Sequence, residues 1–197
     1  CALPIFIGLD FSSSYKDPPG PNNKTEKQSI GTNYQRFHAN RWFTDWFAAV
    51  EKNDEQGVDQ RLLLGGGLGR YLVQSNENQF SILGGIVANR ETKTGIGPDP
   101  LIELATESVT TNAEGKIEIK FLHRKLEPSA DIIFKANYYP LLKDLKSYRY
   151  DSDLTWRREF VDDLFFDLSI YYTYLSDPAE GAQNEDYGVV TSLGYSF

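Results

Sequence analysis

The sequence contains no apolar run long enough to form a membrane-spanning helix. Such a helix needs about 20 consecutive apolar residues, and the 197 residues include no stretch of that kind. Methionine is absent, and the only cysteine is Cys1. A single cysteine excludes an internal disulfide, and Cys1 could be the end left by processing or the acylated residue of a lipoprotein. Without an initiator methionine or signal peptide, we expect a processed or N-terminally truncated chain that forms one domain, residues 1–197.

Charge and histidine content disfavour two classes of function. The formal net charge of −8 argues against a nucleic-acid partner. The two histidines, His38 and His123, have no serine placed beside them in the sequence for a hydrolytic triad. Asp151 and Asp153 share their segment with arginines, which favours ion pairs over a metal site. We therefore expect no enzyme activity, no cofactor and no metal, and a lipid-modifying enzyme is the least favoured function.

The C-terminal part of the chain alternates between apolar and polar residues with a period of two. The segments 148–160, 164–174 and 187–197 each carry an apolar, aromatic-rich face over about ten residues, opposite a face of small, polar or charged residues. That length and pattern are typical of a strand that crosses a bilayer at a tilt. Seven upstream segments alternate more weakly. The expected fold is an all-β, antiparallel transmembrane outer-membrane β-barrel with about ten strands.

Connection lengths also alternate along the chain. Outer-membrane barrels have short periplasmic turns and longer outer loops. We take the segment Leu101–Val109 as part of a large loop, because a further strand there would make the strand count odd. The long connections predicted at the outer surface are Asp17–Glu26, Glu91–Asn112 and Ser176–Glu185, and the short turns predicted in the periplasm are His38–Asn40, Glu127–Ser129 and Val161–Asp163.

The two faces of the predicted strands give two sets of candidate residues. Those expected to face lipid or the interfacial girdles are Trp42, Trp46, Tyr148, Trp156, Phe160, Leu168, Ile170, Tyr172 and Tyr195. Those expected to form a charged network in the interior are Arg61, Lys120, Lys135, Arg149, Asp151, Asp153, Arg157, Glu159 and Asp167. Charges inside a membrane must pair with one another or lie in water. Small barrels are largely filled by side chains, so these mixed charges predict a salt-bridged interior with at most a thin water path.

The glycine-rich segment Gly65–Gly69 is interpreted as a structural feature. It lacks the Lys-Ser/Thr pair of a phosphate-binding loop and lies inside a predicted strand. Glycine there allows strong curvature, or lets a bulky inward side chain lie against bare backbone.

Several motifs carry a family resemblance. Asn40–Phe43, Gly65–Val73 and Asp186–Phe197 resemble the YdiY-like putative salt-induced outer membrane protein family over roughly residues 30–197. The resemblance implies an outer-membrane barrel and supplies no established activity or catalytic residues. Relatives usually have further strands upstream, which leaves two alternatives: the ten strands close alone, or about two more complete a barrel of twelve. Tyr195 and Phe197 also resemble the C-terminal signal that the barrel assembly machinery recognises.

The function we expect is that of a barrel in the outer membrane of a Gram-negative cell, acting as a structural or partner-binding envelope component. A porin-like channel for small solutes or ions is the alternative. The sequence does not separate these two, although inward Tyr71, Tyr139 and Tyr171 leave little room for a channel. The expected partners are outer-membrane lipid and lipopolysaccharide, the barrel assembly machinery during biogenesis, and an envelope protein complex.

Overall fold

The computed structural model describes residues 4–16, 25–54, 58–95, 106–125, 130–161, 164–178 and 182–195. Within them ten antiparallel strands form one sheet, and each strand pairs with its neighbours in the sequence. The strands are β1 (Ile5–Lys16), β2 (Thr25–Phe37), β3 (Trp42–Asn53), β4 (Val58–Gln74), β5 (Asn78–Gly95), β6 (Thr106–Lys125), β7 (Ala130–Pro140), β8 (Tyr148–Val161), β9 (Leu164–Leu175) and β10 (Glu185–Tyr195). The expected all-β, ten-stranded antiparallel fold is confirmed.

Helical structure is minor in this part of the chain. A single 3-10 helix, η1 (Ala39–Arg41), lies at the turn between β2 and β3. No helix in the described ranges has the length and apolar character needed to cross a membrane. The expected connections at 17–24, 126–129, 162–163 and 179–181, together with Cys1 and Phe197, lie outside the described residues.

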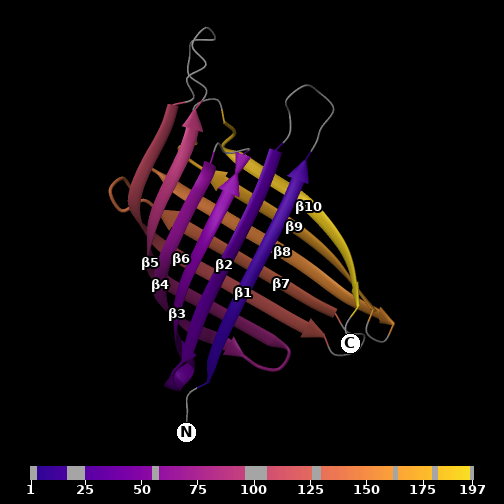
Figure 1. Ribbon diagram of the computed structural model, residues 1–197. Helices are drawn as coiled ribbons and strands as arrows, with labels where there is room; N and C mark the ends of the chain where they lie inside the picture. The colour runs from indigo at the N-terminus through magenta and orange to yellow at the C-terminus, as the bar shows by residue number, and fades with distance from the viewer. Residues whose placement is uncertain are drawn as a thin grey trace.

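The sheet curls around an interior, and its first and last strands approach each other without pairing. Figure 1 shows β10 passing behind the upper part of β1, and the two strands diverging toward the end where the chain termini lie. Among the described residues no hydrogen-bonded ladder joins these two strands. The arrangement is therefore that of a barrel with an open seam between β1 and β10.

The loop predicted over Glu91–Asn112 is wrong at both of its flanks. β5 continues to Gly95 and β6 begins at Thr106, with continuous pairing from Glu91↔Thr110 to Gly95↔Thr106. Of the predicted loop segment Leu101–Val109, the last four residues are strand, and residues 101–105 lie outside the described part of the chain. These strand ends are rich in threonine, which favours β-structure without adding to an apolar face. The apolar alternation therefore underestimates the length of both strands.

The inward glycines of β4 allow close packing inside the sheet. A Cβ atom added at Gly65 would lie 2.7 Å from Cζ of Phe47 and 2.8 Å from the backbone oxygen of Ile86. At Gly69 it would meet the ring of Phe43. The interpretation that these glycines let bulky inward side chains lie against bare backbone is confirmed.

Candidate functional site

The middle of the interior is filled by side chains from opposite walls of the curled sheet. Tyr139 on β7 packs with Leu63 on β4 and Val87 on β5, and Phe47 on β3 contacts this cluster. The ammonium group of Lys116 on β6 lies 4.1 Å from the centroid of the Phe47 ring. Strands that are distant in the sheet order therefore touch across the interior at this level.

A first group of buried charges is centred on Arg61 of β4. Its Nε donates to Glu91 at 2.9 Å, and its Nη1 lies 3.3 Å from Glu51. Three adjacent strands supply this group, since Glu51 is on β3 and Glu91 is on β5. The two carboxylates hold the guanidinium in a position where it is almost inaccessible to solvent.

A second group is centred on Arg149 of β8. Its Nη2 lies 3.3 Å from Glu114 on β6, and its Nη1 lies 3.1 Å from Asp151. The guanidinium carbon also lies 3.8 Å from the centroid of the Tyr139 ring, which is the geometry of a cation–π contact. Arg149 and Glu114 are both buried. Next to them is a polar cavity of about 110 Å³, lined in part by Asn89, Glu114 and Arg149.

A third contact connects the two sides of the seam. Nζ of Lys27 on β2 donates to Asp186 on β10 at 3.0 Å and lies 4.5 Å from the ring centroid of Tyr171 on β9. Lys27 and Asp186 are 159 residues apart in the sequence. This contact holds the second strand near the last two at the end of the barrel where β1 and β10 approach each other.

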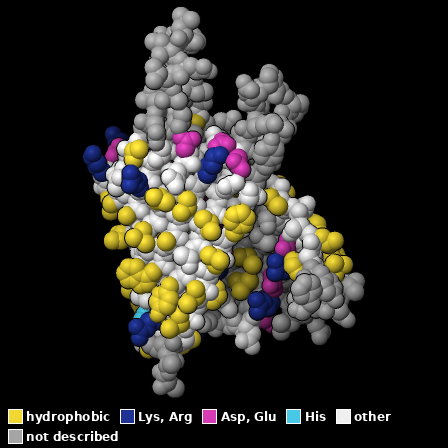
Figure 2. Space-filling view, viewed as in Figure 1, with side chains coloured by type: hydrophobic (Ala, Val, Ile, Leu, Met, Phe, Trp, Pro, Cys, Tyr) yellow, Lys and Arg dark blue, Asp and Glu magenta, His cyan; other side chains and the backbone are white. Residues whose placement is uncertain are grey.

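Further ion pairs lie along β6 to β9. Glu118 lies 3.0 Å from Lys116 and 3.9 Å from Lys135. Arg157 binds Asp167 with two hydrogen bonds of 2.7 and 2.8 Å. The side chain of Arg157 is nevertheless 47% exposed, because its part of the interior faces the open seam. Figure 2 shows charged side chains in the opening between the two walls.

Comparison with known proteins identifies the family of the chain. The family model described as "Protein of unknown function, DUF481" matches residues 7–197. The chain belongs to the DUF481 family. This agrees with the resemblance found in the sequence, since YdiY-like proteins belong to that family. No curated protein and no solved structure matches the chain.

The structure of this DUF481 chain places the residues of the predicted interior network on the inward face of the strands. Lys120 and Asp153 are exposed there, and Glu159 is half-buried near the end of β8. The members that take part in the ion pairs described above are Arg61, Lys135, Arg149, Asp151, Arg157 and Asp167.

Sequence reasoning missed several members of the buried charge groups. Lys27, Glu51, Glu91 and Asp186 lie near strand ends, beyond the strongest apolar alternation, and Glu114 lies within β6, just before its apolar segment 117–121. A signal existed for three of them, because Glu51 and Glu91 both pair with Arg61, and Glu114 has the same inward parity as Lys120 on its own strand.

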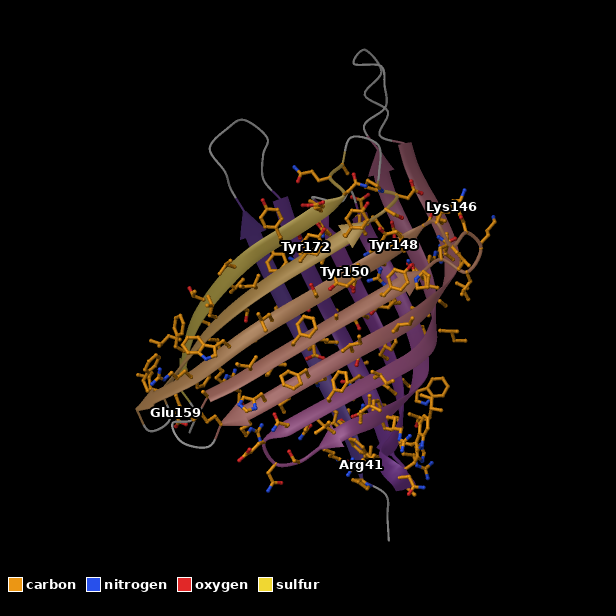
Figure 3. The ribbon with its side chains drawn as sticks, turned by 180° about the vertical axis from the view of Figure 1, so that it is seen from behind. Arg41, Lys146, Tyr148, Tyr150, Glu159 and Tyr172 are labelled. Carbon is orange, nitrogen blue, oxygen red and sulfur yellow. The ribbon has the colours of Figure 1, made fainter. Side chains whose placement is uncertain are left out.

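Aromatic residues on the outward face gather near the two ends of β8. At one end the rings of Tyr148 and Tyr174 stack with their centroids 5.5 Å apart, and those of Tyr150 and Tyr172 lie 6.1 Å apart. Figure 3 shows Tyr148, Tyr150 and Tyr172 on the side of the barrel end marked by Lys146, with Glu159 at the opposite end. Near Glu159 the ring of Phe166 contacts both Trp156 and Phe160.

The remaining candidates on β3 and β9 also lie on the outward side. Trp42 and Trp46 on β3 are exposed, with the guanidinium of Arg70 5.5 Å from the Trp42 ring centroid. On β9, Ile170 is exposed and Leu168 is half-buried. Tyr195 is the last residue of β10, where its Cα pairs with that of Leu164.

Proposed function

We propose that this protein is an integral outer-membrane β-barrel that does not conduct solutes and acts as a structural, partner-binding component of the envelope. The observation that carries the proposal is the inverted placement of apolar and charged side chains. Leu64 and Ile86 are 66% and 68% exposed on the outside, whereas Arg61 and Arg149 are 3% and 4% exposed inside. Water would disfavour this arrangement, and lipid around the barrel favours it.

The distribution of side chains along the barrel supports a membrane setting. In Figure 2 hydrophobic side chains cover the middle of the face formed by β1–β5, while charged side chains gather at its upper and lower rims. The two aromatic clusters at the ends of β8 match the girdles that border the apolar band of such barrels. Outer-membrane barrels place short turns in the periplasm, so the turn Ser75–Glu77 is proposed to face the periplasm and the hairpin Leu141–Ser147 the outside.

The filled interior favours a non-conducting barrel over a porin-like channel. Tyr139 contacts residues of β4 and β5 across the interior, and the Arg61 and Arg149 groups occupy the adjoining level. The polar cavity beside Arg149, about 110 Å³, is small. A continuous water path would require these contacts to separate.

The unpaired seam favours the partner-binding part of the proposal. Backbone N–H and C=O groups at a sheet edge inside a bilayer find no water to bind, so an open edge is costly there. Edge strands exposed in soluble proteins are protected by charges, prolines or bulges. From Tyr187 to Tyr195, β10 has neither a charge nor a proline, and its pairing with β9 is continuous. A strand supplied by a partner would satisfy this edge.

Cysteine labelling tests the membrane placement. In a Cys1→Ser background, we expect Lys143→Cys to react with an impermeant maleimide on intact cells, and Asn76→Cys to react only after the outer membrane is permeabilised. Recovery of the protein outside the outer-membrane fraction would contradict the proposal, and labelling of Asn76→Cys on intact cells would contradict the topology.

Planar-bilayer recordings test the absence of conduction. The wild-type protein should give no stable conductance steps, and the double variant Phe47→Ala/Tyr139→Ala, which removes the contacts across the interior, should give them. Steady single-channel steps from the wild type would establish the channel alternative.

Photo-crosslinking in cells tests the seam. A photoreactive residue at Val189, on the edge strand, should form a discrete adduct with another protein, and the same residue at Ile132, on β7 within the sheet, should not. A crosslink from Val189 to β1 of the same chain would show that the two edges meet each other, and would remove the support for a partner there.

A further inference from the structure

An apolar groove of about 500 Å³ crosses the outward face of β1–β5. Its floor follows from the strand register. Thr32 on β2 pairs with Ala48 on β3, which pairs with Leu64 on β4, which pairs in turn with Ala88 on β5. Three of these four outward residues are small, so the surface is lowered along this row.

Bulkier side chains lie in the outward rows on both sides of the floor. Two residues along each strand from the floor, in the direction of residue 95 of β5, the next outward-facing row contains Ile30, Val50 and Leu62. On the other side of the floor, the corresponding row contains Trp46 and Ile86. Ile30, Val50 and Leu62 line the groove itself, and the row of Trp46 and Ile86 borders it. The groove can therefore accommodate an elongated apolar group.

The floor of the groove carries no unsatisfied hydroxyl. Oγ1 of Thr32 donates to the backbone oxygen of Gly8 at 3.1 Å. Its polar atom is therefore directed to the backbone of β1, and the surface that remains for a ligand is apolar.

A cation lies at one end of the groove. Arg90 on β5 is exposed on the outward face, and it pairs with Leu62 on one side and Thr111 on the other, neither of which is charged. Among the residues that the structure describes, no carboxylate forms an ion pair with it. A charge at a lipid-facing position needs a partner, and guanidinium binds phosphate well through paired hydrogen bonds.

We propose that this groove binds one acyl chain of a lipopolysaccharide molecule, with a phosphate of its lipid A bound by Arg90. The inference rests on the outer-membrane placement proposed above. In that placement the turn before β5 faces the periplasm, so the end of β5 near Gly95 faces the outside. Arg90 therefore lies in the outer leaflet, which lipopolysaccharide forms. An apolar groove that ends at a cation is complementary to a phosphorylated, acylated lipid.

Native mass spectrometry of the purified protein in detergent, titrated with diphosphorylated lipid A, tests the site. Filling the groove with Ala48→Leu/Ala88→Leu should weaken binding by at least tenfold. Arg90→Gln should weaken it by about tenfold, and should remove the preference of the wild type for diphosphorylated over dephosphorylated lipid A. The matched controls are Ala136→Leu on β7 and Arg70→Gln at the other end of β4, which should bind as the wild type does. Heat-modifiable mobility on gels verifies that each variant is folded.

Three results would overturn the inference. Unchanged lipid A affinity in the folded groove variant would exclude the groove as the site. Equal binding of dephosphorylated lipid A by the wild type would exclude the role of Arg90. A change of oligomeric state in the groove variant, with lipid binding unchanged, would assign the groove to a second copy of the chain. Each of these results can occur in a protein that fractionates with the outer membrane, so they are distinct from failure of the proposed function.

Discussion

Arg149 is the interior charge whose removal should affect stability most clearly. It is almost completely buried, and its guanidinium lies 3.3 Å from Glu114 and 3.1 Å from Asp151. Glu114 is itself buried. Replacement of Arg149 by methionine keeps much of the volume and removes the charge, which leaves a carboxylate in the interior without its cation.

The magnitude follows from the burial of the pair. Breaking a buried ion pair by removing one partner costs about 3–5 kcal/mol, because the survivor keeps its desolvation penalty and loses its compensation. We therefore expect Arg149→Met to lower the free energy of unfolding by about that amount. The double variant Arg149→Met/Glu114→Gln should be more stable than the single variant, with a coupling of about 0.5–3 kcal/mol.

The matched control is Arg157→Met. From the sequence alone, Arg157 is expected to belong to a desolvated network, but its side chain is 47% exposed although it lies only 2.7 Å from Asp167. Exposed ion pairs contribute about 0.2–1 kcal/mol, so this variant should lose no more than that.

Urea-dependent unfolding from lipid vesicles, followed by the fluorescence of the three tryptophans, measures all these variants. If Arg149→Met lost less than about 1 kcal/mol, or no more than Arg157→Met, the interior at Arg149 would be hydrated and the argument from burial would be wrong.

Two further predictions concern packing and the lipid face. Gly65→Ala should lower the free energy of unfolding by about 1–3 kcal/mol, because the added Cβ would lie 2.7 Å from the ring of Phe47. The control is Gly84→Ala, where no atom lies within 4 Å of the added Cβ. It should change stability by less than about 0.5 kcal/mol in the same assay. Equal effects would contradict the packing explanation. Ile170→Arg should cost about 2–4 kcal/mol near the bilayer midplane, and Ser169→Arg, on the inward face, should cost less. If arginine were tolerated equally at these two positions, both faces of β9 would be exposed to water.

The sequence by itself determined the fold class, the strand count and the face on which most side chains lie. Successive side chains of a strand point to opposite sides, so a period of two is a local property that can be read without knowing the partners of the strand. The alternation in Leu164–Tyr174 predicts β9 almost to its ends, and the glycines of β4 were assigned to close packing for a reason that Phe47 and Phe43 confirm.

Only the tertiary structure decided which inward charges are buried and which residues they meet. Arg149 and Arg157 share one face of one strand, yet one is buried against Glu114 and the other faces an open seam. Lys27 donates a hydrogen bond to Asp186, which lies 159 residues further along the sequence. Strand pairing and the curvature of the sheet also decide three other features: the ends of β5 and β6, the seam between β1 and β10, and the groove beside Arg90. These features arise from how far each strand extends along its neighbour and how tightly the whole sheet curls, which no single segment encodes.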